Sequence, residues 1–400
     1  MSSNLDARPK GVMTRRAAII FQIATLGTVA MFASAPTPLY RIYQDHWHLS
    51  PVMVTTVFSA YALSLLVALL TVGGLSDYIG RRPVMFSALI LNVLALLVFI
   101  TADSVVALIT ARTIQGFATG IAFGTIGAAM LDLNRAHGSL MNSLTPVTGT
   151  GIGALLSGVL VSYAPPMPTQ LVYLLLLAVT LIQAILLWWM PETVARRPGA
   201  WASLRPIVTV PPHVRQPLTL VSPGNIAVWA LGGFYLSLMP SLLRLITGSN
   251  SPLLGGLAVT ALTLSGAASM LVAHKWPGTT ILIRSMACLI LGVLITLGGV
   301  YTQSVPQLLV GTVIAGFGFG AGFFGSIRTV VPLVPAHERA GLLSVIFIIC
   351  YLAFSLPTIV AGLAIPTLGL PLTLDIYGAA VIVLAAISLI AALASVRRAL

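Results

Sequence analysis

The chain has 400 residues, of which 20 are Lys or Arg and 8 are Asp or Glu, so only 7% are charged and 58% are apolar. About 25% charged residues are usual in a soluble globular domain, so this composition excludes a soluble fold, and it also excludes disorder, collagen, coiled coils and disulfide scaffolds. The net charge of +12 does not indicate a nucleic-acid binder, because the basic residues sit in short breaks between apolar runs and not on one soluble face.

Twelve apolar runs are long enough to cross a bilayer, which requires about 20 mostly apolar residues. In chain order they are residues 17–38, 51–73, 83–102, 105–131, 140–163, 169–190, 223–245, 253–273, 280–301, 306–330, 340–364 and 373–395. Strands of a membrane β-barrel would be about half as long and would alternate in polarity. The sequence therefore predicts an all-α polytopic membrane protein with twelve transmembrane helices.

The first apolar run has two interpretations. Arg15 and Arg16, an apolar stretch and Ala33-Ser34-Ala35 are typical of a signal peptide with an A-x-A cleavage site. The apolar stretch is long for a signal peptide, and cleavage would leave eleven spans. We therefore expect an uncleaved first helix.

The positions of Lys and Arg predict the orientation, because positive charge concentrates on cytoplasmic loops. With the amino terminus inside, the inward-facing basic residues are Arg8, Lys10, Arg15, Arg16, Arg81, Arg82, Arg135, Arg196, Arg197, Arg205, Arg215, Lys275, Arg339, Arg397 and Arg398. Only Arg41 and Arg244 face outward. We expect both termini in the cytoplasm and the chain in a bacterial inner (plasma) membrane.

A Pro-rich, basic break at mid-chain divides the spans into two sets of six. The expected parts are a cytoplasmic tail (1–16), an N-terminal six-helix half (17–190), a cytoplasmic linker (191–222), a C-terminal six-helix half (223–396) and a second cytoplasmic tail (397–400). The linker is interpreted as a segment that rests on anionic lipid headgroups.

The two halves share a short internal sequence repeat. Gly116-Phe117, Gly120 and Phe123 recur 200 residues later as Gly316-Phe317, Gly320 and Phe323. Internal duplication of this kind is typical of transporters built from two pseudo-symmetric halves. Glycines at four-residue spacing let helices approach closely, either as static packing or as a surface on which the halves rock.

The loop between the second and third predicted helices reads GGLSDYIGRR over residues 73–82. It resembles motif A of the major facilitator superfamily (MFS), G-x-L-[AS]-D-x-x-G-R-[RK]. The resemblance, with Asp132 at the same end of the fourth helix, indicates a conformational gate made of Gly73, Asp77, Gly80, Arg81, Arg82 and Asp132. Asp77 and Arg81 are four residues apart and can pair, and Asp132 is a second partner for Arg81. An ordinary positive-inside loop would explain the arginines but not the glycines or Asp77.

The fourth predicted helix carries Arg112, Gln115 and Gly116, in an arrangement that is similar to motif B of the superfamily, R-x-x-Q-G. Arg112 lies about seven residues from the end of its span, which places it roughly 10 Å inside the membrane at 1.5 Å per residue. A charge at that depth is costly and usually functional, unless the side chain snorkels to the interface. The resemblance implies a role for Arg112 in proton transfer or substrate binding.

The fifth predicted helix reads GTGIGALLSG over residues 149–158, similar to motif C of the antiporters, G-x-x-x-G-P-x-x-G-G. Gly149, Gly153 and Gly158 match, whereas Ala154 and Ser157 replace a proline and a glycine. The segment from Ala35 to Tyr40 resembles bacterial drug-efflux members of the superfamily. Together these resemblances imply a twelve-helix MFS transporter that works by alternating access, with efflux as the direction.

The acidic residues bear on coupling and substrate. They are Asp6, Asp45, Asp77, Asp103, Asp132, Glu192, Glu338 and Asp375, and none falls at mid-span. An exporter of cations would be expected to carry a buried carboxylate, whereas this chain offers Arg112 and Arg328. We expect a neutral or anionic small organic solute, moved by proton-coupled efflux; a uniporter or importer of a neutral or anionic metabolite and a non-transporting receptor of the same fold are the alternatives.

Polar and aromatic residues inside the spans are candidates for the substrate cavity, although interhelical hydrogen bonding and packing explain them equally. They are Gln22, Thr25, Trp229, Tyr235, Arg328 and Tyr351. Asp45, His46 and His48 are interpreted as solvated loop residues and not as a metal site, and the two cysteines as small core residues.

Other functional classes lack their signatures. There is no H-E-x-x-H, acidic pair or Ser–Lys arrangement of an intramembrane enzyme, and no set of pore-lining repeats of an oligomeric channel. We expect no cofactor, no metal and no nucleic acid. The expected partners are a small-molecule substrate, protons and the lipid bilayer, with the monomer as the functional unit.

Overall fold

The structure is a computed structural model, which describes residues 13–134, 137–164, 167–249, 251–335 and 337–399. Arg8, Lys10 and Arg135, three of the basic residues used to predict the orientation, lie outside the described residues. Within the described ranges the chain forms helices and no strand.

The helices follow one another with short connections. The N-terminal half contains α1 (Arg15–Ser34), α2 (Tyr40–Trp47), α3 (Pro51–Thr71), α4 (Ser76–Ile79), α5 (Arg81–Ile100), α6 (Val105–Leu133), α7 (Gly138–Tyr163), α8 (Leu171–Leu186) and η1 (Leu187–Trp189). After η2 (Ala202–Leu204), the C-terminal half contains α9 (Pro212–Ser237), α10 (Met239–Thr247), α11 (Pro252–Ala273), α12 (Gly278–Tyr301), α13 (Val305–Val330), η3 (Val331–Leu333) and α14 (Arg339–Ala399).

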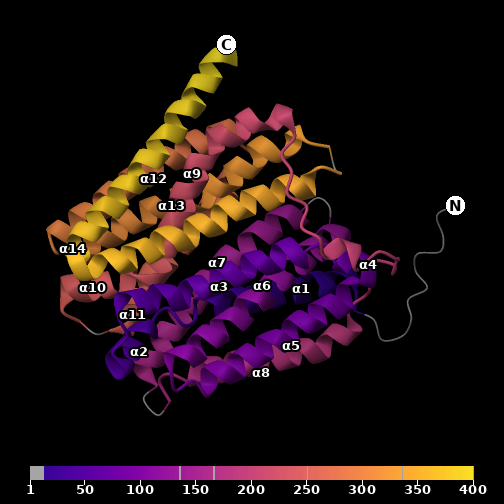
Figure 1. The fold of residues 1–400 in the computed structure, drawn as a ribbon, viewed down its shortest axis with the longest axis horizontal. Coiled ribbons are helices and arrows are strands. Elements are labelled where there is room, and N and C mark those ends of the chain that lie inside the picture. The colour runs from indigo at the N-terminus through magenta and orange to yellow at the C-terminus, as the bar shows by residue number, and fades with distance from the viewer. Residues whose placement is uncertain (1–12, 135–136, 165–166, 250, 336, 400) are drawn as a thin grey trace.

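Twelve crossings can be traced in the described residues. Ten helices are long and apolar enough to cross a membrane, and α9 and α10 together form another span that is bent by 60°. One of the ten, α14, is interrupted at Gly369, whose φ of +74° favours a residue without a Cβ atom. Its two limbs diverge from this break (Figure 1), so α14 supplies two spans. The predicted all-α twelve-helix class is confirmed.

Several predicted helix ends are wrong. The first span ends at Ser34 and not at residue 38, because Pro36 and Pro38 cannot continue its hydrogen bonding. The seventh span begins at Pro212, inside the segment predicted to be a linker, since proline is well suited to the first turn of a helix. It ends at Ser237, and the residues that follow form the separate helix α10.

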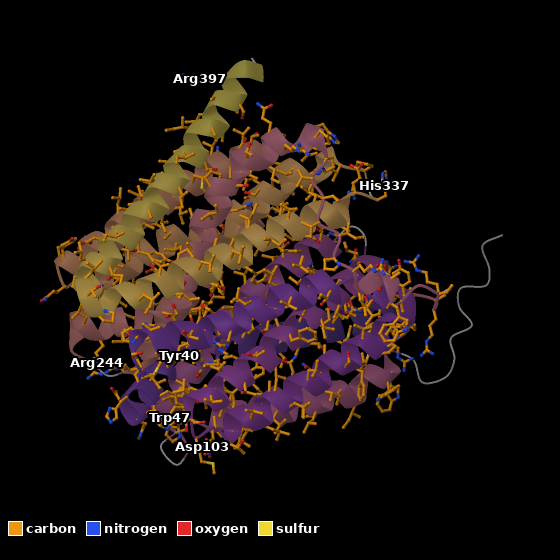
Figure 2. The ribbon with its side chains drawn as sticks, in the orientation of Figure 1. Tyr40, Trp47, Asp103, Arg244, His337 and Arg397 are labelled. Carbon is orange, nitrogen blue, oxygen red and sulfur yellow. The ribbon has the colours of Figure 1, made fainter. Side chains whose placement is uncertain are left out.

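The two halves lie side by side with largely separate cores (Figure 1). They meet where α7 packs on α11 and where α3 packs on α14. We call one end of the molecule, which carries α2 and α10, the α10 end. The opposite end, which carries α4, is the α4 end. Figure 2 places Tyr40, Trp47, Asp103 and Arg244 at the α10 end and His337 at the other.

The side-chain hydrogen bonds that join the two halves within the described residues lie at the α10 end or in the middle of the molecule. At the α10 end, Thr37 Oγ1 donates to the Leu236 carbonyl at 3.0 Å, and Arg244 pairs with Asp45. Nearer the middle, Thr260 Oγ1 donates to the Gly151 carbonyl at 2.9 Å. The halves are thus joined more closely at one end than at the other.

Candidate functional site

The Arg81 cluster lies at the α4 end and is made of Ser76, Asp77, Arg81, Asp132 and Glu192. The Arg81 side chain is 6% exposed; its Nη1 contacts Asp77 Oδ1 at 2.5 Å and donates to Ser76 Oγ at 2.7 Å. Its Nε donates to Asp132 Oδ2 at 3.1 Å. The structure thus brings together Asp77, Arg81 and Asp132, three of the four charged residues that the sequence places in a gate, while their role as a gate remains a prediction.

Glu192 is the member of the Arg81 cluster that the sequence did not indicate. Its carboxylate accepts the backbone N–H of Arg81 at 2.8 Å and that of Arg82 at 3.0 Å. Gly80 precedes α5 and has no side chain to cap it, so a distant carboxylate satisfies the free N–H groups at the positive end of the helix dipole. In the sequence, the only sign of this contact was that Gly80 offers no side-chain cap to α5.

The backbone conformation at Gly80 explains why the motif has a glycine at this position. Its φ is +101°, a backbone conformation that side chains disfavour. A Cβ atom at this position would also lie 2.7 Å from Glu192 Oε2. Gly80 therefore allows both the turn into α5 and the close approach of the capping carboxylate.

The neighbouring Arg82 lies outside the paired charges. Its Nη2 donates to the Trp188 carbonyl at 2.5 Å, and its guanidinium lies 5.7 Å from the centre of the Trp188 ring. Arg82 thus connects the start of α5 to η1, the short helix that follows α8, through a hydrogen bond and a cation–π contact.

The Arg112 site lies in the interior of the N-terminal half and consists of Tyr40, Tyr61, Arg112 and Gln115. Arg112 is fully buried. Its Nε donates to Tyr40 Oη at 2.8 Å, and its Nη1 donates to Gln115 Oε1 at 2.8 Å and to the Ala33 carbonyl at 2.9 Å. The guanidinium carbon also lies 5.1 Å from the centre of the Tyr61 ring. The snorkelling interpretation is therefore wrong.

The end of α1 explains how a buried cation is held without a carboxylate. Pro36 has no N–H, so the Phe32 carbonyl lacks its usual partner four residues later; it accepts from the Ala35 N–H at 3.3 Å and from Gln115 Nε2 at 2.8 Å. Thr37 N–H bonds to the Ser34 carbonyl, which leaves the Ala33 carbonyl for Arg112. These carbonyls lie at the negative end of the helix dipole, where a cation is favoured.

The remaining residue of the predicted motif B, Gly116, packs against α3. A Cβ atom on Gly116 would clash with the Tyr61 carbonyl and with Ser64 Oγ. The glycine therefore brings α6 close to α3 and holds the Tyr61 ring beside Arg112.

The glycines of the predicted motif C serve two contacts of α7. Gly149 and Gly153 face α1, where added Cβ atoms would lie 2.7 Å from the Gly27 carbonyl and 2.5 Å from Met31 Cα, respectively. Gly158 faces α11 of the other half, and its added Cβ atom would lie 3.2 Å from Leu253 Cα. Ser157, which departs from the motif, donates to the Ala35 carbonyl at 2.6 Å.

The residues proposed to line one substrate cavity do not lie together. Trp229 and Tyr351 meet in the middle of the molecule, with ring centres 4.8 Å apart, and Trp229 also lies beside Phe354 of α14. Phe354 in turn contacts Phe58 of α3 across the two halves. Trp229 Nε1 is buried and has no partner among the described residues, so it is a donor available to a solute in this seam.

The other four cavity candidates lie away from this contact, and their role in substrate binding stays a prediction. Gln22 and Thr25 are buried in the N-terminal half, bonded to Met190 Sδ at 3.6 Å and to the Phe21 carbonyl at 2.8 Å, respectively. Tyr235 is buried in the C-terminal half and shares a 2.7 Å hydrogen bond with Thr312. Arg328 is exposed near the end of α13 and donates to the His274 carbonyl. The position of a residue within a predicted span does not identify which face of the helix points to the boundary between the two halves.

Metal ligands do not gather in the part of the chain that is described: no three His, Cys, Asp or Glu side chains lie close enough to hold an ion. Asp45 and His46 lie in α2 and not in the predicted loop, and Asp45 contacts Arg41 at 2.6 Å and Arg244 at 3.2 Å. The expectation of no metal stays a prediction.

The profile of the Major Facilitator Superfamily matches residues 23–358. The chain belongs to this superfamily. It is therefore a polytopic membrane protein of a transporter family, which implies a small-molecule substrate and the lipid bilayer as partners. The motif-based resemblance is confirmed at the level of the family.

Two known proteins are similar to the chain. Multidrug resistance protein D of Escherichia coli (strain K12) is 41% identical over 68 residues, which is 17% of this chain and 17% of that protein. The crystal structure of a mutant of the nucleoside transporter NupG superposes with a TM-score of 0.72 at 12% identity, over 94% of this chain and 99% of that one. The second likeness supports the fold alone.

Proposed function

We propose that the protein is a secondary active transporter that moves a small organic solute across the membrane by alternating access. One observation carries the proposal: the two halves are bonded to each other at the α10 end, through Thr37, Asp45 and Arg244. At the α4 end the Arg81 cluster is bonded within the N-terminal half and the segment after α8. Separating one end while closing the other is what such a transporter requires.

The distribution of basic residues supports an orientation with the α4 end in the cytoplasm. Arg81, Arg82 and Arg197 lie at that end, where Arg197 Nε donates to the Asp77 carbonyl at 3.0 Å. Arg41 and Arg244 lie at the other. In this orientation both termini are cytoplasmic, and we infer a bacterial inner membrane and a conformation that is closed toward the outside.

The buried charges support a neutral or anionic solute. Arg112 and Arg81 are the buried charged side chains of the described residues, and no Asp or Glu among those residues is buried. A cation in the middle of the molecule would have no carboxylate to balance it, and an unbalanced buried charge is costly. An anionic or neutral solute beside Trp229 and Tyr351 avoids that penalty.

Efflux coupled to protons is the direction and energy source that we infer. The glycine pattern of α7 that resembles motif C and the short similarity to a protein named for multidrug resistance support export. The Arg112 site, through its resemblance to motif B, supports proton coupling. The alternatives are a uniporter or importer of a metabolite, and a receptor that does not transport.

A flux assay in proteoliposomes tests the proposal. Inverted and right-side-out preparations are loaded with matched lipophilic anions, cations and neutral solutes, with and without an imposed pH gradient. We expect gradient-dependent movement of an anion or a neutral solute. Preferential movement of the cation would overturn the substrate class, gradient-independent flux would favour a uniporter, and no flux in any condition would favour a receptor.

A further inference from the structure

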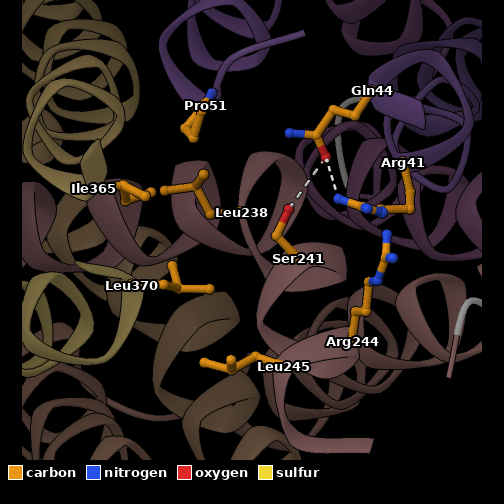
Figure 3. Close-up of a pocket in the computed structure, with 9 residues that line it drawn as sticks. All are labelled: Arg41, Gln44, Pro51, Leu238, Ser241, Arg244, Leu245, Ile365 and Leu370. Carbon is orange, nitrogen blue, oxygen red and sulfur yellow. Dashed lines mark hydrogen bonds between the residues drawn. The ribbon is translucent and has the colours of Figure 1, made fainter. Parts of the chain in front are cut away.

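A cavity of about 440 Å³ opens between the two halves at the α10 end (Figure 3). Its volume falls within the range of about 300–1,000 Å³ that is usual for small-molecule sites. It is lined by Arg41, Gln44, Pro51, Leu238, Ser241, Arg244, Leu245, Ile365 and Leu370. It is separate from the Trp229–Tyr351 contact and from both arginine sites described above.

One wall of the cavity is cationic. Arg41 and Arg244, from different halves, share the single carboxylate of Asp45, which lies 2.6 Å from Arg41 Nη2 and 3.2 Å from Arg244 Nη1. Two guanidinium groups against one carboxylate leave one positive charge. Gln44 Oε1 accepts from Arg41 Nη1 at 3.3 Å and from Ser241 Oγ at 3.4 Å, as Figure 3 shows.

Arg41 also keeps a free donor. Its Nε atom is buried and has no hydrogen-bond partner among the described residues. A buried unpaired donor is costly unless a ligand or water accepts from it. The guanidinium groups bind carboxylate and sulfonate oxygens through several parallel N–H groups, so this wall fits an anionic headgroup.

The opposite wall is apolar. It is formed by Pro51, Leu238, Leu245, Ile365 and Leu370, which lie to the left of the two arginines in Figure 3. Apolar walls with a few convergent polar groups are typical of sites that bind organic ligands. A ligand that fills both walls has one charged head and one apolar body.

We propose that this cavity, the anion pocket, binds an amphipathic organic anion, with its headgroup on Arg41 and Arg244 and its body against the apolar wall. A bound headgroup competes with Asp45 for the two arginines. Because Asp45 and Arg244 form an ion pair between the halves, binding loosens the closed α10 end. The site stands on its own geometry, whereas this opening step rests on the proposed transport function.

Equilibrium binding of radiolabelled octanoate to the full chain in phosphatidylcholine nanodiscs tests the site without any transport. Arg41→Gln and Arg244→Gln each remove charge-assisted hydrogen bonds, so we expect about tenfold weaker binding for each. Asp45→Asn removes the competing carboxylate and is expected to strengthen binding. Arg215→Gln, which changes an exposed arginine at the start of α9, is the matched control.

Binding is expected to weaken in the two arginine variants and to strengthen in Asp45→Asn. This pattern cannot come from misfolding, because a misfolded variant would not bind octanoate more tightly. Unchanged binding in both arginine variants, weaker binding in Asp45→Asn, or equal displacement by octylamine and octanoate would overturn the proposal. Since no gradient is applied, a failure here leaves the flux result standing, and a failure of flux leaves this result standing.

Nanodiscs that contain phosphatidylglycerol separate the two sources of such an anion. If octanoate binding is unchanged, the pocket takes a free solute. If phosphatidylglycerol abolishes the arginine-dependent binding seen in phosphatidylcholine, the lipid headgroup occupies the same anion pocket. Absence of arginine-dependent binding in both lipids would contradict the pocket altogether.

Discussion

Two arginines of the N-terminal half are held in opposite ways. Arg81 lies near the α4 end and pairs with Asp77 and Asp132, whose side chains are 45% and 32% exposed. Arg112 is fully buried, and its partners among the described residues are a phenol, an amide and a carbonyl. The first arrangement is screened by water and salt, whereas the second is neither.

This difference indicates different uses. Asp77 and Asp132 are partly exposed, so they can leave the buried Arg81 side chain and return to water at less cost than a fully buried partner could, which suits a contact that forms and breaks. A buried guanidinium with fixed neutral partners is held in one geometry, because moving it would leave buried polar groups without hydrogen bonds. We therefore infer that the Arg81 cluster is the movable element and that the Arg112 site is the rigid one.

The largest effect is expected at Arg112. In Arg112→Lys the charge remains, but an ammonium group cannot reach Tyr40, Ala33 and Gln115 together as the planar guanidinium does. We expect flux to fall by about tenfold or more, since charge-assisted bonds are lost at a buried site. Proteoliposome flux, normalised to inserted protein, measures it; wild-type flux would contradict a functional role for this arginine.

A substitution at Tyr40 tests whether Arg112 depends on its neutral hydrogen-bond partners. Tyr40→Phe removes the phenol oxygen that accepts from Arg112 but keeps the ring beside it. Thermal unfolding in detergent should show a loss of about 2 kcal/mol, because a charged donor is left unpaired in the interior. Tyr43→Phe is the control, since its hydroxyl shares only a 3.4 Å contact with Tyr173. Equal losses in the two variants would show that Arg112 does not depend on Tyr40.

Gly80 tests the turn that builds the Arg81 cluster. Gly80→Ala places a Cβ atom at φ +101° and 2.7 Å from Glu192 Oε2, so we expect about 1–2 kcal/mol of destabilisation from the positive-φ backbone alone, a conformation that glycine adopts most readily. In Gly74→Ala, the matched control, the nearest atom to the new Cβ atom is 3.9 Å away. Thermal unfolding of both variants gives the comparison, and a tolerated Gly80→Ala would contradict this role of the glycine.

The smallest stability effect is expected in the carboxylates of the Arg81 cluster. Asp132→Asn removes one partner of Arg81 but should cost at most about 1 kcal/mol, since that carboxylate is partly exposed. Its effect on flux should be larger than its effect on stability and should disappear as ionic strength rises, because salt screens the pair in the wild type too. A salt-independent difference would place this ion pair outside the movable element.

The sequence predicts the Arg81 cluster better than the Arg112 site for a physical reason. Asp77 and Arg81 are one helical turn apart, so their contact follows from spacing alone. The bond between Tyr40 and Arg112 spans 72 residues, and the Glu192 contact of the Arg81 cluster, which the sequence did not indicate either, spans 111. Such contacts depend on tertiary packing, and the local trace of the Arg112 site in the sequence is Pro36, which has no N–H to donate to the Phe32 carbonyl.

The substrate candidates show the same limit. Trp229 and Tyr351 meet because α9 and α14 pack together, whereas Tyr235, on the same helix as Trp229, faces the interior of its own half. Composition locates a helix in the membrane but does not orient each of its faces when the whole helix is apolar. The twelve crossings were predictable from apolar length, and their inner faces were not.

A reversible crosslink across the α10 end tests alternating access most directly. Gln44 and Ser241 lie on different halves with 3.4 Å between Oε1 and Oγ. In a background where Cys288 and Cys350 are replaced by alanine, Gln44→Cys and Ser241→Cys would be joined by a short bifunctional methanethiosulfonate, which forms a disulfide with each cysteine; each single variant is the control. We predict that crosslinking abolishes flux and that reductant restores it. Wild-type flux through the crosslinked protein would contradict a transport cycle in which the α10 end must open.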